Sequence, residues 1–358
     1  MAQTYAAPVS ELRVALIGYG LAGRWFHAPL ITSTPQLTLS SVVTSSPERQ
    51  QQVRHDHPEA QVVPGAEALW DGPAHDLVVV ATPNTSHAPL ATAAIDRGLP
   101  VVIDKPLAVS SEEAQALVRA AEQAGVMLTV FQNRRWDSDH LTLRRLMGQG
   151  KLGDILRYES RFERWRPEAD ASAWRAADPD QGGGQLLDLG SHLVDQALQL
   201  FGPVTHIYAE VAGLRGLQAD DDAFLALRHA AGPISHLRAS ALTAAPGPRL
   251  RVLGTRAGFT IEGLDSQEDA LRAGRRPDTD PSWGSEPRSS WGHLVRGESR
   301  EIVESQRGDW PRFYALVAEA LRGAGPPPVD PWDAVETLRI LDLARQSAVT
   351  SSVLELAP

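Results

Sequence analysis

Continuous apolar runs alternate with amphipathic stretches over about the first 130 residues. A short run without polar alternation is typical of a strand buried on both faces in a parallel sheet. The stretches between the runs carry helix signals, and the last opens with two serines followed by acids and ends at Gly125. This alternation predicts a doubly wound α/β domain. The expected strands are 12–18, 37–43, 60–63, 76–82, 100–104 and 126–131, with helices from about residue 24, from residue 47, and over 87–98 and 110–125.

After residue 132 the pattern changes to a period of two, with large side chains at every second position of 155–165. This period predicts an antiparallel sheet, which usually has one open face. The turn-rich segment 273–290 predicts a long loop. The sequence therefore predicts a domain over residues 1–131 and an α+β domain over 132–358, built on a large, open, mainly antiparallel sheet. Further strands are expected at 205–214, 223–229, 233–240, 248–255 and 258–263, and helices at about 310–322 and 331–348, the last a candidate to pack back on the first domain.

Charge and composition narrow the function classes. The 358 residues include 34 Lys and Arg against 44 Asp and Glu, a net charge of −10 that argues against a broad nucleic-acid or anionic-membrane surface. The absence of cysteine excludes disulfides, thiolate nucleophiles and Cys-ligated zinc. The first residues resemble no signal peptide and the apolar runs are too short to span a bilayer, so we expect a cytoplasmic protein.

The segment "GYGLAG" (18–23) leaves a predicted buried strand and enters a predicted helix. That context favours dinucleotide binding, although a purely structural turn is the alternative. Gly18 would allow the tight turn, Gly20 the approach of backbone to the pyrophosphate, and Gly23 close packing of helix on strand. The helix N-terminus would offer N–H groups to the phosphates. Expected contacts in this Rossmann-type turn are Gly18, Gly20, Leu21, Ala22 and Gly23.

The end of the second strand indicates which cofactor is bound. NAD enzymes usually carry an acid there, bonded to the ribose 2′-hydroxyl. Here Thr44, Ser45 and Ser46 occupy that place, with Arg49 nearby. Hydroxyls and a guanidinium suit a 2′-phosphate, so we expect NADP(H) rather than NAD(H). The alternative is that the serines only cap the helix that begins at Pro47.

Lys105 follows a predicted buried strand directly, at the edge where open α/β sheets bind ligands. Its position alone fits a surface lysine as well as a pocket cation. The preceding residue is Asp104 and the next is Pro106, which makes the chain stiff beyond the lysine.

The Leu-rich stretch 186–200 predicts a helix without any Lys, Arg or Glu. At about 100° per residue, Asp188, His192, Asp195 and Gln199 form one narrow polar stripe on it. The alternatives are a solvated face, buried polar groups with partners, a metal site, and general acid–base chemistry. For Asp195 and Gln199 we favour buried groups with partners. A metal site lacks a third strong ligand nearby in sequence.

Three segments together resemble the glucose–fructose oxidoreductase/inositol dehydrogenase (Gfo/Idh/MocA) family over essentially the whole chain. They are "GYGLAG" after the first strand, "DKP" after the fifth, and "GGGQLLDLGSHLVD" (182–195). "GYGLAGRWFHAPLI" and "FQNRRWDSDHLTLRRL" resemble its NADP-dependent scyllo-inositol dehydrogenase-like branch. The family usually has Glu-Lys-Pro, so Asp104 shortens a supporting carboxylate by one methylene but keeps the lysine and proline.

The resemblance implies an enzyme that transfers hydride between a nicotinamide and a hydroxyl carbon of a cyclitol or sugar, first of all scyllo-inositol and its 2-ketone, without a metal. It implies that His192 takes the hydroxyl proton, Lys105 stabilises the alkoxide and Asp188 positions the substrate. Oxidation would then rise with pH through about the histidine value of 6.5, moved by Lys105 and Asp188. The alternatives are an aldose or other keto-sugar substrate, or a non-catalytic NADP-sensing regulator. A homo-oligomer, a dimer or tetramer, would form through the open sheet.

The resemblance also implies further site residues. Cofactor contacts would add Thr82, Pro83, Asn84, His87, Lys105, Trp174 and Arg175 to the glycine-rich turn and to Ser45, Ser46 and Arg49. Contacts with the polyol would come from Lys105, Asn133, Arg134, Arg164, Trp165, Asp188 and His192.

Overall fold

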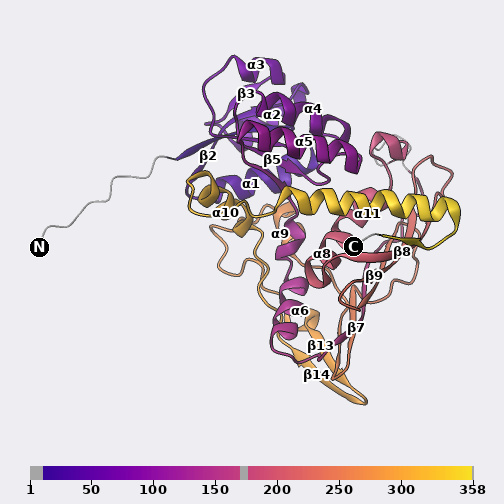
Figure 1. The fold of residues 1–358 in the computed structure, drawn as a ribbon. Coiled ribbons are helices and arrows are strands. Elements are labelled where there is room, and N and C mark those ends of the chain that lie inside the picture. The colour runs from indigo at the N-terminus through magenta and orange to yellow at the C-terminus, as the bar shows by residue number, and fades with distance from the viewer. Residues whose placement is uncertain (1–10, 170–175, 357–358) are drawn as a thin grey trace, which may run out of the picture.

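Two sheets organise the chain in the computed structural model, which describes residues 11–169 and 176–356 (Figure 1). The first sheet contains β1 (Leu12–Ile17), β2 (Leu37–Val43), β3 (Gln61–Val63), β4 (Leu77–Val80), β5 (Val101–Asp104) and β6 (Leu128–Phe131). The second contains β7 (Ile155–Glu163), β8 (Val204–Ala212), β9 (Asp222–His229), β10 (Ile234–Ser240), β11 (Leu250–Gly254), β12 (Gly258–Ile261), β13 (Gly292–Arg296), β14 (Ser299–Val303) and β15 (Leu354–Glu355).

The first sheet has the order β3-β2-β1-β4-β5-β6, and all its pairs are parallel. Its central strands are buried on both faces, which is why they read as unbroken apolar runs. Its helical segments are η1 (Gly23–His27), α1 (Ala28–Thr32), α2 (Pro47–Asp56), α3 (Ala66–Trp70), η2 (Asn84–Ser86), α4 (His87–Ile95) and α5 (Ser111–Ala124). The six expected strands and the doubly wound fold are confirmed, because each strand lies within its expected range.

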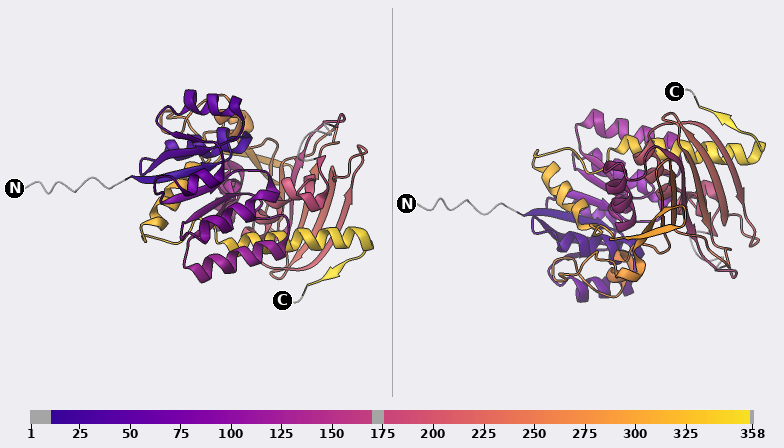
Figure 2. Two further views of the ribbon diagram at one scale, coloured as in Figure 1. Left: turned by 90° about the horizontal axis from the view of Figure 1, so that it is seen from above. Right: turned by 90° about the horizontal axis from the view of Figure 1, so that it is seen from below.

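The second sheet has the order β14-β13-β12-β11-β7-β10-β9-β8-β15 and is antiparallel except for the β7–β10 pair. Alternate residues of β9 and β10 are buried, as the period of two predicts. The intervening residues, such as Phe224 and His236, are only half-buried and stack on each other at 5.6 Å. Figure 2 shows the strands of this sheet together at one side of the molecule.

The stretch 186–200 is two helices, not one, which corrects the sequence prediction. α7 (Gln185–Asp188) ends and α8 (Gly190–Phe201) begins around Leu189, whose φ is −101° and ψ −33°. A Cβ on Gly190 would lie 3.2 Å from the Leu341 side chain, so the break occurs where the backbone meets a neighbouring helix closely. Asp188 and His192 therefore do not share one regular helix face.

Several elements are absent from the sequence prediction. They are α6 (Ser138–Gly148), α9 (Gln267–Arg272), α3 and the hairpin β13–β14, besides the single turns η3 (Asn133–Trp136), η5 (Pro179–Gln181) and η6 (Arg288–Ser290). In α6, polar residues such as Asp139 and His140 are buried. The sequence of α6 therefore lacks the hydrophobic period by which a helix is predicted. The segment 273–290 contains no strand and only the short turn η6, as expected of a long loop.

The C-terminal helices α10 (Pro311–Leu321) and α11 (Pro331–Thr350) connect the two sheets. The Trp332 indole donates to Glu122 on α5 at 2.7 Å, and Asp342 accepts from the Ser111 backbone N–H at 2.9 Å. Further along, Ser347 accepts from the backbone of β8. The last helix thus contacts both halves, while the boundary at residue 131 stays a prediction. No helix in the described ranges has the length and apolar character needed to cross a membrane.

Candidate active site between the two sheets

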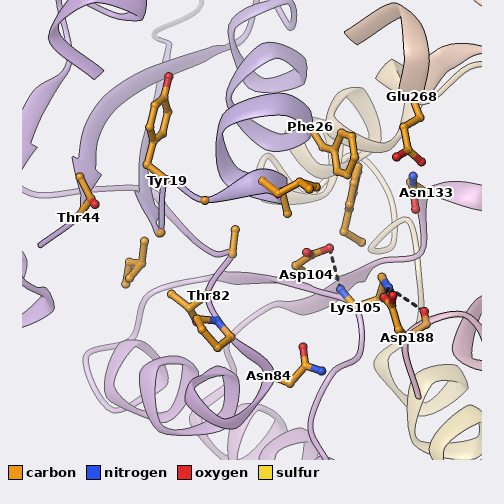
Figure 3. Close-up of a pocket in the computed structure, with 18 of the residues that line it drawn as sticks. Tyr19, Phe26, Thr44, Thr82, Asn84, Asp104, Lys105, Asn133, Asp188 and Glu268 are labelled. Carbon is orange, nitrogen blue, oxygen red and sulfur yellow. Dashed lines mark hydrogen bonds and ion pairs between the residues drawn. The ribbon is translucent and has the colours of Figure 1, made fainter. Parts of the chain in front are cut away.

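A cavity of about 1060 Å³ lies between the sheets, from the turn after β1 to the start of α8 (Figure 3). Its walls are the carboxyl ends of β1, β2, β4 and β5, together with η3, α8 and α9. Fifteen of the expected cofactor and substrate contacts line it: Gly18, Gly20, Leu21, Ala22, Ser45, Arg49, Thr82, Pro83, Asn84, Lys105, Asn133, Arg134, Arg164, Asp188 and His192. The fold thus brings together most of the expected cofactor and substrate contacts.

The glycine-rich turn has no room for side chains where backbone must pass. Gly18 has φ +101°, and a Cβ there would lie 2.3 Å from the carbonyl oxygen of Ala81. A Cβ on Gly23 would lie 2.0 Å from the Gly18 oxygen, so Gly23 packs the helix on the strand and does not line the cavity. Gly20 has open space around it except for the Arg49 guanidinium at 3.9 Å. The turn leaves backbone accessible to a ligand at Gly20, which fits a pyrophosphate.

The cavity wall at the end of β2 carries hydroxyls and a cation. Thr44, Ser45 and Arg49 line it, and the neighbouring lining residues 64–66 are Pro, Gly and Ala. Ser46 lies outside the lining and caps α2 by accepting the Arg49 backbone N–H at 3.3 Å. Each interpretation of the serines therefore holds for one residue: Ser46 is a helix cap, whereas Ser45 faces the cavity. This wall suits a phosphate group better than a free ribose hydroxyl, which is usually held by a carboxylate.

The loop after β4 is fixed to its neighbours by side chains. Asn84 donates to the Gly182 carbonyl at 2.8 Å, which ties this loop to the three-glycine run before α7. His87, expected as a cofactor contact, is fully buried and is not among the residues that line the cavity. Its ring nitrogens lie 2.9 Å from the Thr82 carbonyl oxygen and 2.8 Å from that of Pro106. The ring thus joins two loops from behind the wall.

Lys105 and Asp188 form a buried ion pair at the inner end of the cavity (Figure 3). The Lys105 ammonium donates to Asp188 Oδ1 at 2.7 Å and to the Asp188 backbone oxygen at 2.8 Å. Their side chains are 15% and 5% exposed. An ammonium has three N–H groups, and within the described chain these two bonds use two of them. The third N–H is therefore available to an oxygen in the cavity.

His192 lines the cavity next to this pair and is 5% exposed. Its Nδ1 is buried and has no hydrogen-bond partner among the described residues. The other ring nitrogen, Nε2, is not among such buried atoms, so it is the nitrogen a ligand can reach. Burial lowers the pKa of His192 well below its ordinary 6.5, and the positive charges of Lys105 and Arg134 lower it further. The ring is therefore neutral near pH 7 and can accept a proton.

Arg134 and Arg164, two of the arginines that line the cavity, have different surroundings. Arg134 donates to Asp137 and to Glu268, both at 3.1 Å, so its charge is balanced. No hydrogen bond or ion pair involves the Arg164 guanidinium within the described ranges. Burial and the nearby Arg166 lower its pKa. The Arg164 guanidinium is thus open to a ligand.

Other expected site residues lie elsewhere. Trp165 is 58% exposed and absent from the lining, because the alternation along an extended chain turns it away from the side of Arg164. Trp174 and Arg175 lie outside the described residues. The Asp195 carboxylate accepts from Arg135 at 2.9 and 2.5 Å, and Gln199 donates to Asp333 at 3.2 Å. Asp195 is a buried polar group with a partner, as favoured from the sequence, whereas Gln199 has a partner but is exposed, so the expectation of burial is wrong for Gln199.

The sequence reading missed the contribution of α9 to the cavity. Glu268, Asp269 and Arg272 line it, and Figure 3 shows Glu268 beside Asn133. Phe26, in η1, also lines it. The α9 residues come from a segment with no motif, so their place follows only from the tertiary fold. No group of three or more His, Asp or Glu side chains in the described part of the chain is arranged to hold a metal.

Comparison with known proteins identifies the family. Residues 12–132 match the "Oxidoreductase family, NAD-binding Rossmann fold" (GFO_IDH_MocA), and residues 144–356 match the "Oxidoreductase family, C-terminal alpha/beta domain" (GFO_IDH_MocA_C). The chain is 37% identical over 344 residues to "scyllo-inositol 2-dehydrogenase (NADP(+)) IolW" of Bacillus subtilis (strain 168), covering 95% of this chain and 94% of that protein.

Two further proteins are similar over nearly their whole length. The oxidoreductase YdgJ of Escherichia coli (strain K12) is 40% identical over 353 residues, which cover 97% of this chain and 99% of YdgJ. The solved structure of the oxidoreductase yvaA from Bacillus subtilis superposes with a TM-score of 0.91 at 36% identity, covering 98% of this chain and 100% of that one. On these matches and on the geometry of the cavity, the chain belongs to the Gfo/Idh/MocA family of oxidoreductases.

Proposed function

We propose that the protein is an NADP(H)-dependent dehydrogenase that interconverts a secondary hydroxyl and a ketone on a cyclitol or sugar, with scyllo-inositol as the first substrate to test. The observation that carries the proposal is the Lys105–Asp188 pair beside the neutral, accessible His192, at the inner end of the cavity. The similarity to a scyllo-inositol 2-dehydrogenase supports the choice of substrate.

The residues present fit a nicotinamide dinucleotide. The glycine-rich turn would admit the pyrophosphate. Gly18 makes the tight turn, where no side chain fits, and Gly20 has no side chain that would keep a phosphate from the backbone. Ser45 and Arg49 would hold a ribose 2′-phosphate, because no acid stands at that end of the lining. When bound, the nicotinamide would supply the hydride acceptor or donor. Thr82, Pro83 and Asn84 line the cavity and would contact the bound cofactor.

The chain's own groups would then handle the proton and the charge. In alcohol oxidation, the hydroxyl would lie between His192 Nε2 and the third N–H of Lys105, and His192 would accept its proton. Lys105 would stabilise the oxygen as it becomes negative, because an ammonium in a buried site acts with little screening. Asp188 would hold the ammonium in place through two hydrogen bonds. In ketone reduction, the ring would return the proton.

The substrate would be recognised by polar groups around this centre. Asn133 and Arg164 line the cavity, and their side chains have no hydrogen-bond partner among the described residues that would compete with a ligand, whereas Arg134 is held by two acids. An amide and a guanidinium can each serve several hydroxyl oxygens of a polyol. Glu268, next to Asn133, would accept from hydroxyl groups. This arrangement suits a ring with many hydroxyls better than an apolar alcohol.

The proposal is tested by measuring reduction of NADP⁺ and of NAD⁺, through nicotinamide absorbance, with scyllo-inositol, myo-inositol and a panel of aldoses. We expect turnover with a cyclitol or sugar and NADP⁺, and a higher kcat/KM than with NAD⁺. Turnover with an aldose only would move the substrate to the sugar class with the same chemistry. Activity with NAD⁺ alone would overturn the cofactor assignment, and no activity with any polyol would overturn the reaction.

We also propose that the outer face of the nine-stranded sheet joins copies of the chain into a homo-oligomer. Half-buried residues such as Phe224 and His236 on this face support the proposal. Light scattering after size-exclusion chromatography would test it. A Phe224→Glu variant is expected to shift the mass toward one chain, and an unchanged monomer mass in both proteins would contradict it.

A further inference from the structure

A buried polar chain lies behind the loop that carries Lys105, and the proposed mechanism does not use it. It consists of Tyr314 on α10, His27 in η1 and Asp104 at the end of β5. We propose that Tyr314, acting through His27, positions Asp104 and thereby Lys105, so that α10 is part of the positioning machinery of the site. The inference rests on the proposed role of Lys105.

The contacts form a continuous path to the lysine. The Tyr314 hydroxyl lies 2.6 Å from His27 Nδ1. His27 Nε2 faces Asp104 Oδ1 at 3.6 Å. Asp104 Oδ1 in turn accepts the Lys105 backbone N–H at 2.9 Å, the bond drawn in Figure 3. A residue more than two hundred positions away in sequence is therefore two contacts from the loop of the catalytic candidate.

Protonation gives this path a direction. Burial raises the pKa of Tyr314 well above its ordinary value, so its hydroxyl stays protonated and can donate a hydrogen bond to His27 Nδ1, 2.6 Å away. A neutral ring that accepts at Nδ1 carries its hydrogen on Nε2, toward Asp104. Burial alone would raise the pKa of Asp104, but His27, Lys105 and His87 outweigh it and lower that pKa. With that tautomer, the Asp104 carboxylate would face an N–H of His27 across 3.6 Å.

The surroundings of His27 leave its ring no other polar role. The side chain is fully buried, and Nε2 has no hydrogen-bond partner within the described ranges. The Phe131 ring lies 4.5 Å from the His27 ring, and Phe131 packs on Phe313 at 5.0 Å. Leaving polar atoms unpaired in such apolar surroundings is unfavourable. The groups that hold His27 are therefore Tyr314 on one side and the Asp104 charge on the other.

The amino-acid composition makes the effect on Lys105 directly measurable. The chain contains two lysines, Lys105 and Lys151. Lys151 is exposed, between α6 and β7. Protein labelled with ¹³C at lysine Cε therefore gives one signal from the site and one internal reference. Measuring the Lys105 signal needs neither substrate nor cofactor, so the test stays valid if the wild-type protein lacks the proposed polyol activity.

The test compares Tyr314→Phe with Tyr158→Phe. Each change removes one hydroxyl from a fully buried tyrosine and keeps the ring. The Tyr158 hydroxyl bonds Ser160 in the second sheet, and Tyr158 does not line the cavity. A third variant, His27→Gln, keeps a side-chain donor at the centre of the path. Thermal unfolding of all three shows which proteins are folded.

For Tyr314→Phe we expect the Lys105 signal to move and the Lys151 signal to stay. We also expect kcat to fall about ten-fold to hundred-fold, as small misplacements of catalytic groups do, with little change in KM for NADP⁺. His27→Gln should lie between this variant and the wild type, and Tyr158→Phe should change neither signal nor kcat. The proposal is overturned if the Lys105 signal of Tyr314→Phe stays in place, or if kcat of this folded variant equals that of the wild type.

Discussion

Replacing His192 by alanine separates catalysis from stability in this protein. A positioned general base contributes about 10²–10⁴-fold to turnover, which equals roughly 2.7–5.4 kcal/mol in the activation barrier. Among the described residues, His192 Nδ1 has no hydrogen-bond partner, and the ring borders the cavity, so removing it leaves no described buried group without a partner. We therefore expect a large loss of kcat at a small cost in the free energy of unfolding.

The matched control is His229→Ala, at another buried histidine. His229 lies on β9, outside the cavity, and its ring nitrogens contact the Gly202 carbonyl and the Ser235 hydroxyl, both at 2.8 Å. Its removal leaves both groups unpaired, at a cost of about 1–3 kcal/mol for each buried group. We expect the opposite result from His192→Ala: lower stability with turnover close to that of the wild type.

Steady-state kinetics with NADP⁺ and the accepted polyol, together with denaturant unfolding, give both quantities for each variant. Binding of NADP⁺ is measured separately by calorimetry and is expected to persist in His192→Ala. The glycine-rich turn follows β1 and Arg49 lies on α2, both in the half of the chain that forms the first sheet. If His192→Ala turned over within about three-fold of the wild type, far less than a general base contributes, the proton role of His192 would be refuted.

The remaining predictions concern pH, the cofactor and a buried ion pair. Because the pKa of His192 is lowered, its neutral form prevails at and above pH 6.5, so kcat/KM for oxidation should be flat from about pH 6.5 to 8 and fall only at lower pH; a rise centred near 6.5 would contradict this environment. Arg49→Gln should weaken binding of NADP⁺ about ten-fold to hundred-fold in calorimetry and leave that of NAD⁺ unchanged, whereas an equal loss for both would place Arg49 away from the 2′-phosphate. Asp195→Ala leaves the buried Arg135 with only Asp333, so unfolding in denaturant should show a loss of about 3 kcal/mol with unchanged KM; a loss of substrate affinity instead would assign Asp195 to the site.

The sequence predicted the first sheet well because its strands are buried on both faces. Such strands have no face toward solvent, so they are apolar throughout and their composition alone identifies them. It predicted α6 and α9 poorly. In α6 the fold buries charged residues such as Asp139 against Arg249, and such pairing across the fold leaves no hydrophobic period.

The candidate site divides in the same way. The glycine-rich turn could be predicted, since the constraint at Gly18 is local: a positive φ and a neighbouring strand exclude any side chain. The polar stripe of 186–200 could be noticed but not resolved. Asp188 and His192 face the cavity, whereas Asp195 and Gln199 bind residues of other elements. His87 was assigned to the cofactor, and its two carbonyl contacts place it behind the wall.

The sequence by itself determined the class of the first sheet, the cofactor turn and the candidate residues, because these depend on local backbone geometry and on burial patterns. Only the tertiary structure decided which polar groups meet. The 2.7 Å contact of Lys105 with Asp188 joins residues 83 positions apart, and Tyr314 reaches His27 across 287. Such contacts depend on how two sheets and the C-terminal helices pack against each other. No local sequence pattern predicts contacts between residues so far apart in the chain.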